Sequence, residues 1–457
     1  MKRYIILGAG ISGLSLAWFL KRRFENRANI IILEKEDRAG GWIQTVQQDG
    51  FVFEQGPRGC RPKGITGTET LRLIEELGLQ KEVVFANPAA HLRYLLIRKK
   101  LRALPSGVFS FLTFPLAWKI VCGIFQDLYT PPFLGKDESI HAFVSRRFGN
   151  TLAESLFDPL ATGIYGGDIR QLSVKACFPL LSKWEQDGGS VLKGAFLRRI
   201  AEAKCFTASK FVEEAQKHPL FSFKKGMATL TQELTKSLEK DLKLSSSVAG
   251  VNLYPHRVEV KQVNGTVIEG DHLFSTLPAK TTASLLSSSR LAYLSHIPEV
   301  SVAVVNLGYY KQVLKKRGYG YLIPSQEKEQ IMGMTWDSEI FPQQNTIPEE
   351  TRLTVMMGGA HNKQIEQYSL KQIKEVAYQA VQEHLQIPSL PDSVSIKIAR
   401  EAIPQYLVGH NDKISEIENM ISKMFRNLTL CGSSYYGVAV NDCIAKSRSI
   451  VDNFIYT

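Results

Sequence analysis

Consecutive apolar residues near the start of the chain predict the first strands of a parallel sheet. Residues 4–7 form an unbroken apolar run, which is typical of a strand buried on both faces. Residues 30–33 predict a second such strand, and residues 14–23 between them have a helix-compatible composition. This order of strand, helix and strand predicts an α/β domain at the start of the chain.

Further along, the pattern predicts more helices and two groups of strands. Helices are expected at 71–77, 139–147, 152–160, 226–242 and 364–385, and from the last strand to residue 454. Strands are expected at 247–253, 259–262 and 272–276, which would complete the first sheet, and at 301–309, 353–358 and 428–431. The strands at 301–309 and 353–358 flank residues 319–324 and predict a second, mostly antiparallel sheet.

The expected architecture is α/β, or α+β when the separate sheets are counted, with several domains. We expect a Rossmann-like dinucleotide-binding domain from residues 1–86, 220–290 and 400–457. A helical insertion is expected at 87–219, and a mixed-sheet substrate domain at 291–399.

Two segments each admit two interpretations. Residues 109–129 are rich in Phe, Leu, Ile and Trp, and Lys119 and Asp127 are their only charged residues. Periodicity favours a core helix, whereas the basic residues at 98–102 favour an interfacial segment whose cations meet anionic lipid head groups. Residues 163–168, which contain three glycines, fit a loop over a flat ligand as well as a plain helix–helix turn.

A glycine pattern follows the first predicted strand directly. Its residues are Gly8, Ala9, Gly10, Ile11, Ser12 and Gly13, which match G-x-G-x-x-G. The first glycine permits a tight turn, the second lets the backbone approach a pyrophosphate, and the third permits close packing of helix on sheet. The N-terminus of the following helix supplies N–H donors. A dinucleotide site is therefore predicted here.

Glu34 ends the second predicted strand and limits which dinucleotide is expected. It lies 21 residues beyond Gly13, where an acid accepts hydrogen bonds from ribose hydroxyls and repels a 2′-phosphate. The sequence therefore favours FAD or NAD over NADP.

The charge and cysteine content restrict partners and compartment. Lys and Arg number 56 and Asp and Glu 44, so the net charge is +12, which favours nucleic acid, an anionic membrane surface or an acidic substrate. The six cysteines are widely spaced without a C-x-x-C pair, which predicts a reduced, intracellular setting.

The longest uncharged stretch near the middle of the chain, residues 103–118, contains two prolines and is shorter than the about 20 residues that a membrane-spanning helix needs. With no room for a cleavable signal before the first strand, we expect a cytoplasmic protein that is soluble or peripheral to a membrane.

Several further motifs agree with one flavoprotein family. Glu34, Arg38 and the glycines before Trp42 give E-x-x-x-R-x-G-G, which resembles the second fingerprint of amine-oxidase-type flavoproteins. The motifs at 54–59 (EQGPRG), 403–406 (IPQY) and 436–444 (YGVAVNDCI) are more discriminating. On these residues, from the first strand to the last helix, the chain resembles the oxygen-dependent protoporphyrinogen oxidases of the flavin amine-oxidase-like superfamily. The first domain would then be an FAD-binding domain, and the insertion would be membrane-associated.

The resemblance implies an FAD site spread over the chain. The glycine loop would hold the dinucleotide, Glu34 would lie at the ribose, and Val248 would hold adenine through its backbone. The complete implied set is Gly8, Ala9, Gly10, Ile11, Ser12, Gly13, Glu34, Lys35, Arg38, Gly41, Trp42, Gly56, Pro57, Arg58, Gly59, Val248, Gly437, Val438 and Ala439.

The resemblance to this flavoprotein family also implies a substrate site and a reaction. Arg93 matches a propionate-binding arginine, Gly163 a backbone position at the reacting tetrapyrrole, and Tyr319, Leu322 and Met356 the apolar residues that sandwich its rings. Animal homologues often have Phe where this chain has Tyr319. The implied reaction is the conversion of protoporphyrinogen to protoporphyrin by three two-electron oxidations, with O₂ as acceptor and release of H₂O₂. No residue is assigned as catalytic acid or base and no metal is expected, because the cofactor supplies the chemistry.

The implied partners are the porphyrinogen, O₂ and an anionic membrane surface, with a homodimer and handover to ferrochelatase but no nucleic acid. The expected location is the cytoplasm, on the inner face of a membrane. The alternatives are a coproporphyrinogen III oxidase, an amine oxidase or carotenoid desaturase, and a non-catalytic binding protein like the GDP-dissociation inhibitors.

Overall fold

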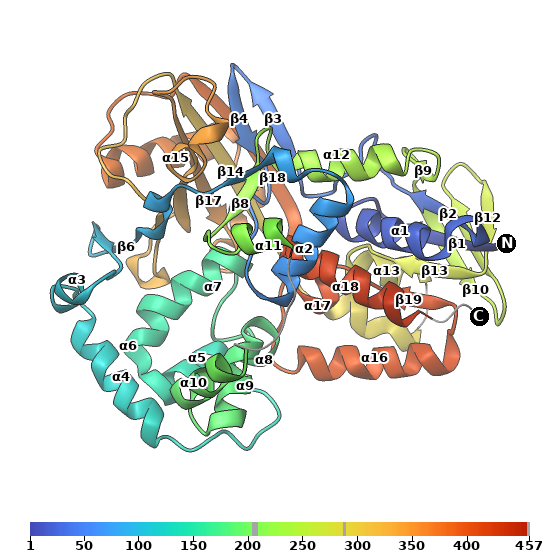
Figure 1. Ribbon diagram of the computed structural model, residues 1–457, viewed down its shortest axis with the longest axis horizontal. Coiled ribbons are helices and arrows are strands. Elements are labelled where there is room, and N and C mark those ends of the chain that lie inside the picture. The colour runs from blue at the N-terminus through green and yellow to red at the C-terminus, as the bar shows by residue number, and fades with distance from the viewer. Residues whose placement is uncertain (203–208, 287–288, 455–457) are drawn as a thin grey trace.

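A five-stranded parallel sheet joins segments that are far apart in the sequence (Figure 1). The computed structural model describes residues 1–202, 209–286 and 289–454. The strand order is β19 (Leu428–Leu430), β13 (His272–Ser275), β1 (Lys2–Leu7), β2 (Ala28–Leu33) and β9 (Leu242–Lys243), and every neighbouring pair is parallel. The predicted α/β unit is confirmed, because the apolar runs of β1 and β2 are buried at its centre.

Helices cover one face of this sheet, and a small second sheet covers the other. The helices are α1 (Ile11–Phe24), α2 (Gly64–Glu76), α11 (Lys210–Ala215), α12 (Ala228–Ser237) and α18 (Val440–Asn453). The opposite face packs against α13 (Ala279–Leu286), α16 (His410–Met424) and the antiparallel sheet β10 (Val248–Leu253), β11 (Val258–Gln262) and β12 (Val267–Gly270). Strands 247–253 and 259–262 therefore form a sheet of their own, and the prediction that they complete the parallel sheet is wrong.

A seven-stranded sheet forms the second large layer. Its order is β18 (Ser393–Pro404), β14 (Glu299–Tyr309), β17 (Thr351–Gly358), β16 (Gly333–Trp336), β15 (Gly320–Leu322), β6 (Arg93–Ile97) and β7 (Lys100–Ala103). Only the β15–β6 pair is parallel among these strands, so the predicted mostly antiparallel sheet is confirmed. Strands β6 and β7 belong to this sheet, although the sequence assigned residues 93–103 to the helical insertion.

One face of the seven-stranded sheet packs against α15 (Leu370–Leu385). Ser369 and Gln372 form a capping box at the start of α15, which separates it from the 3₁₀ turn at Lys363–Gln367. The predicted helix at 364–385 is therefore two elements.

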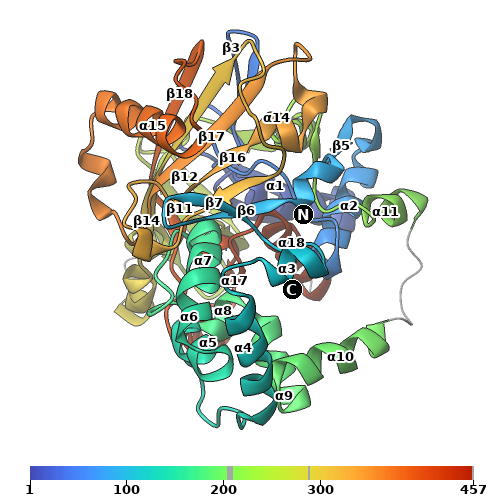
Figure 2. The same cartoon turned by 90° about the vertical axis from the view of Figure 1, so that its left-hand side faces the viewer.

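A group of helices lies beside the two sheets (Figure 2). They are α3 (Val108–Leu112), α4 (Ala117–Tyr129), α5 (Ile140–Phe148), α6 (Asn150–Leu152), α7 (Asp158–Tyr165), α8 (Val174–Cys177), α9 (Pro179–Gly188) and α10 (Val191–Glu202), with a π-helical turn at Ala153–Phe157. Arg147 of α5 is fully buried and pairs with Asp127 of α4 and Glu185 of α9. This pairing explains a charge in the otherwise apolar segment 109–129.

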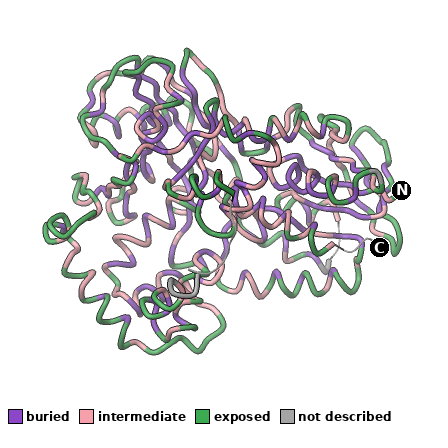
Figure 3. Tube along the Cα trace, in the orientation of Figure 1, coloured by how far each residue is buried: buried purple, intermediate pink, exposed green. Residues whose placement is uncertain are grey.

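Most of the segment 109–129 lies at the surface (Figure 3). Only Gly123 and Asp127 of α4 are buried, whereas Phe109 and Trp118 are 88% and 72% exposed. The core interpretation of this segment is therefore wrong. The loop interpretation of 163–168 is also wrong at Gly163, since α7 includes it and ends at Tyr165, before Gly166 in the left-handed conformation.

Among the described residues, no helix is long and apolar enough to cross a membrane. Five cysteines are free thiols, namely Cys60, Cys122, Cys177, Cys431 and Cys443. Cys205 lies outside the described residues.

Candidate dinucleotide and substrate site

The first glycine loop joins the end of β1 to the start of α1. A Cβ added at Gly13 would lie 2.0 Å from the Gly8 carbonyl oxygen, so only glycine fits there. Helix α1 begins after Gly10 with no side-chain cap and no acidic residue in its first turn. Its N-terminal amides and partial positive charge are therefore directed at a site for an anion.

A second glycine loop lies against the first. The Gly40 amide donates to the Ala9 carbonyl oxygen at 2.8 Å, and a Cβ added at Gly41 would lie 3.1 Å from the Gly10 Cα. The Arg38 guanidinium donates to the Gly41 carbonyl oxygen at 2.7 Å and stabilises this loop. The structure thus brings together the two glycine motifs that the sequence analysis singled out.

Glu34 is buried at the end of β2, beside the first loop. Its carboxylate accepts hydrogen bonds from the amides of Ala9 and Glu36 at 2.8 and 3.0 Å. The Ser246 amide donates to the Glu34 carbonyl oxygen at 2.7 Å. A cavity of about 270 Å³ lies beside Val248 and is lined by residues 245–247 and 262–264. Lys35 differs from these neighbours, because its side chain is 73% exposed and pairs with Glu36 at 3.5 Å.

The loop at 56–59 follows β4 (Phe51–Glu54) and supplies a buried cation. A Cβ added at Gly56 would lie 2.0 Å from the Trp42 carbonyl oxygen, which places this loop against the second glycine loop. Arg58 Nε lies 3.3 Å from Asp337 Oδ1, yet Nε and Nη2 are buried without a hydrogen-bond partner. A buried guanidinium with unused donors is costly, so it is suited to an anionic or carbonyl-bearing ligand.

Glu54, directly before this loop, is a buried carboxyl group. It accepts hydrogen bonds from the Met227 amide at 2.7 Å and the Thr45 hydroxyl at 2.9 Å. Burial, the largest influence, raises its pKa from 4.5 to about 7.

A third loop lies before α18 and is held by Tyr406. The Gly437 amide donates to the Tyr406 hydroxyl oxygen at 2.8 Å, and that hydroxyl donates to the Ser433 carbonyl oxygen. Gly437 has φ +138°, and a Cβ there would lie 2.6 Å from the Asp442 side chain. Like α1, α18 has no side-chain cap. The Ser447 hydroxyl donates to the Ser12 carbonyl oxygen at 3.0 Å and joins the two helices.

The five residues assigned to the substrate come from the seven-stranded sheet, from the residue before β15 and from α7. Leu322, Gly333 and Met356 are directly opposite one another on β15, β16 and β17. A Cβ added at Gly163 of α7 would lie 2.8 Å from Leu322 Cδ2. The Arg93 guanidinium lies over the Tyr319 ring, 5.3 Å from its centroid. All five assigned residues are half-buried, so this face of the sheet remains partly open.

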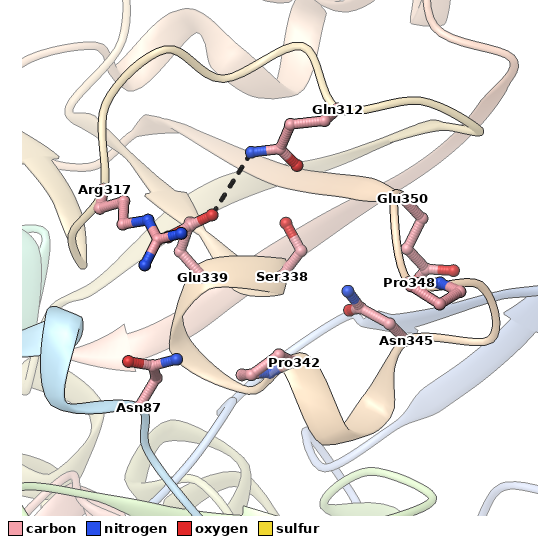
Figure 4. A pocket seen from close by; sticks show the side chains of 9 residues that line it. All are labelled: Asn87, Gln312, Arg317, Ser338, Glu339, Pro342, Asn345, Pro348 and Glu350. Atoms are coloured by element: carbon pink, nitrogen blue, oxygen red, sulfur yellow. Dashed lines mark hydrogen bonds between the residues drawn. The ribbon is translucent and has the colours of Figure 1, made fainter.

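A separate cavity of about 160 Å³ contains none of the predicted site residues (Figure 4). Its lining is mainly polar, and Gln312 donates to Glu339 at 3.5 Å within it. It plays no part in the site described here.

Comparison with known proteins gives the family. Residues 11–453 match the model described as flavin containing amine oxidoreductase. The chain belongs to this family. This chain is 35% identical to protoporphyrinogen oxidase of Bos taurus, and the match covers 97% of this chain and 96% of the relative. It is 28% identical to coproporphyrinogen III oxidase of Bacillus subtilis, and this match covers 99% of the chain and 97% of the relative. A crystal structure from Exiguobacterium sp. 255-15 has a TM-score of 0.84 at 24% identity, over 99% and 98% of the chains.

The family makes this protein an oxidoreductase with FAD as its cofactor. The site fits a dinucleotide, since α1 and α18 are uncapped, the glycine loops admit close backbone approach, and Arg58 has unused donors. The family match is to oxidoreductases, so the alternative of a non-catalytic binding protein is not supported.

Sequence reasoning missed two contributors to the site of this amine oxidoreductase. Asp337 pairs with Arg58 and accepts a hydrogen bond from Thr335 at 2.9 Å. Tyr406 lies in a motif that was noted only for its resemblance. Both act through contacts between segments far apart in the chain, which no local pattern reveals.

Proposed function

We propose that this FAD-dependent oxidase converts protoporphyrinogen IX to protoporphyrin IX in haem biosynthesis. Three two-electron oxidations remove six electrons and six protons from the substrate, and three O₂ are reduced to three H₂O₂. The observation that supports this proposal is the half-open apolar surface of Leu322 and Met356 with Arg93 beside it. A flat apolar molecule with carboxylates fits such a surface. The printed names of the relatives, which include protoporphyrinogen oxidases, agree with it.

The cofactor residues follow from the same proposal. FAD supplies hydride acceptance and transfer of electrons to O₂. The loops at 8–13 and 38–42 bind the pyrophosphate, and Glu34 binds the ribose. Val248, which lies beside the 270 Å³ cavity, binds the adenine. The loops at 56–59 and 437–439 bind the ring end, where Tyr406 fixes the Gly437 amide. Lys35 is the weakest assignment, because its side chain is directed to solvent.

The substrate residues orient the macrocycle and exclude water. Arg93 binds a propionate through charge-assisted hydrogen bonds. Tyr319, Leu322 and Met356 contact the rings, and the small Gly163 lets α7 approach them. These residues act by positioning, because the bound cofactor supplies the redox chemistry.

The test is an oxygen-uptake assay of the purified protein with protoporphyrinogen IX, read together with porphyrin fluorescence. We expect a yellow protein that consumes three O₂ per porphyrin formed. A protein that is colourless and cannot be reconstituted with FAD would contradict the proposal. Coproporphyrinogen III is the second candidate, since the Bacillus subtilis relative bears that name.

The exposed residues of α3 and α4 support contact with an anionic membrane. Val108, Phe109, Leu112 and Trp118 are each at least 70% exposed, and the basic residues at 98–102 lie on the neighbouring hairpin. We expect the protein to float with acidic vesicles and less with neutral ones. Replacing Phe109 and Trp118 by Ser should abolish flotation, whereas Leu390→Ser, equally exposed elsewhere, should not. Equal flotation of all three proteins would contradict membrane contact through α3 and α4.

The domain division is also a proposal, with two boundaries moved. The FAD-binding domain comprises 1–86, 220–290 and 405–457, because residues 400–404 end strand β18 of the seven-stranded sheet. The helical insertion starts after Ala103 instead of at 87, because β6 pairs with β15 and β7 pairs with β6. A homodimer, handover to ferrochelatase and a cytoplasmic, membrane-peripheral location remain predictions.

A further inference from the structure

The edge strand β7 places a second arginine on the same face of the sheet as Arg93. Leu95 is directly opposite Arg102 in the antiparallel β6–β7 pair. Side chains two residues apart on a strand share a face, so Arg93, Leu95 and Arg102 lie on one face. The neighbouring residues Leu96 and Leu101 pack with the core beneath α15, which assigns the opposite face to them.

The two arginines are close neighbours without a carboxylate partner. Arg93 and Arg102 are a diagonal cross-strand pair, a relation that places Cα atoms about 7–8 Å apart. Among the described residues, no carboxylate oxygen lies within 4.0 Å of either guanidinium. Two guanidinium groups carried by neighbouring strands on one face can each donate to a carboxylate of the same ligand.

The surface next to this pair is apolar. A row of residues, each directly opposite the next on adjacent strands, crosses this face from Arg102 on β7 to Lys397 on β18, the far edge. The residues between these two are Leu95, Leu322, Gly333, Met356 and Val304. Six strand spacings of about 4.8 Å separate Arg102 from Lys397, about 29 Å in all. A single macrocycle is too small to meet both ends, so a substrate held at Arg102 has the rest of its rings on the apolar middle of the row. Figure 2 shows β6 and β7 above helix α7, whose Gly163 approaches Leu322 on this face.

We propose that Arg93 and Arg102 together bind two carboxylates on one edge of the substrate, and that this pair determines specificity for a dicarboxylate porphyrinogen. The inference rests on the proposed function and extends it to substrate choice. A macrocycle with two adjacent propionates places both at the arginines and its uncharged substituents on the apolar row. A tetracarboxylate places its remaining acids against Leu322 and Met356, where they lose hydration without gaining a partner.

The test measures porphyrin binding, independently of turnover. The proteins are wild type, Arg93→Gln, Arg102→Gln and the double variant, and the ligands are protoporphyrin IX and its dimethyl ester in lipid-free buffer. We expect Arg102→Gln to weaken diacid binding by about 3- to 10-fold, less than Arg93→Gln because Arg102 is exposed. The weakening should shrink at high salt. Binding of the dimethyl ester should be the same for all four proteins.

The matched control is Arg400→Gln, which removes an exposed arginine from the opposite edge strand β18. It should leave both affinities unchanged. Equal losses for diacid and ester in Arg102→Gln would indicate a structural effect and overturn the proposal, as would an unchanged diacid affinity. If wild type binds the diacid through both arginines but fails to oxidise protoporphyrinogen IX, the proposed function fails and the carboxylate pair stands.

Discussion

The two faces of the seven-stranded sheet consist of alternate residues of the same strands, but they differ in what covers them. The face beneath α15 is a closed apolar core that includes Leu353, Trp336 and Ile373. On the other face Asn306 donates to the Glu54 carbonyl oxygen at 3.1 Å, and Leu322 and Met356 are half-buried. Adjacent residues of one strand therefore lie in different environments, one in a closed core and the other on the face that we propose binds substrate.

The largest expected effect is on the core face, at Leu353 of β17. Leu353→Ala leaves a cavity in a fully buried position, so we expect a loss of about 2–5 kcal/mol in the free energy of unfolding. Urea unfolding measures this loss, and titration with protoporphyrin IX should show unchanged affinity. A variant of wild-type stability with weakened porphyrin binding would reverse the assignment of the two faces.

The next effect is a pH dependence of the free energy of unfolding, which we expect from Glu54. This residue belongs to the segment that lies against the open face. The pKa of this carboxyl group is about 7 in the folded protein and 4.5 when unperturbed, so the folded state holds the proton more tightly. Its contribution to the free energy of unfolding is fully present below about pH 4.5 and is lost as the pH rises to about 7. The loss amounts to at most about 3 kcal/mol. Urea midpoints between pH 4.5 and 8 should show a smaller decline for Glu54→Gln than for wild type. Parallel profiles would contradict the raised pKa.

A third effect separates binding from stability at Arg93. Arg93→Ala removes the charge-assisted hydrogen bonds, so KM should rise about 10- to 150-fold, equivalent to about 1.5–3 kcal/mol, with kcat little changed. Arg93→Lys should recover only part of the loss, since Lys lacks the bidentate geometry. Steady-state kinetics with protoporphyrinogen IX provide the measurement, and unchanged kinetics would remove Arg93 from the site.

The smallest effect on stability is expected at Met356, three residues after Leu353 on the same strand. Because Met356 is half-buried on the open face, Met356→Ala should cost less than about 1 kcal/mol of unfolding free energy and raise KM a few-fold. Comparison with Leu353→Ala in the same urea and kinetic assays sharpens the contrast between faces. A stability loss equal to that of Leu353→Ala would show that the open face is also core.

Local patterns predicted the parts of the fold that local chemistry specifies. The buried runs of β1 and β2, the glycine loop and Glu34 are all readable in the sequence, because strand burial and pyrophosphate approach require those residue types in that order. Strands β6 and β7 were not predicted in the second sheet, since the pairing of β6 with β15 joins segments far apart in the chain.

Exposure and register were the other properties that the sequence did not determine. The apolar pattern of 109–129 is the same for a core helix and a surface helix, and only the packing of α4 shows that Trp118 is exposed. Similarly, Arg102 shares a face with Arg93 only because Leu95 is its cross-strand partner. The sequence therefore pointed to Arg93 but not to the proposed pair of Arg93 and Arg102.

The most direct test of the account is the ratio of kcat/KM for protoporphyrinogen IX to that for coproporphyrinogen III, measured by oxygen uptake on the FAD-loaded protein. The proposed carboxylate site at Arg93 and Arg102 and the apolar middle of the open face predict a ratio well above one, with three O₂ consumed per protoporphyrin IX formed. A ratio well below one would contradict the proposed substrate and favour the coproporphyrinogen reaction.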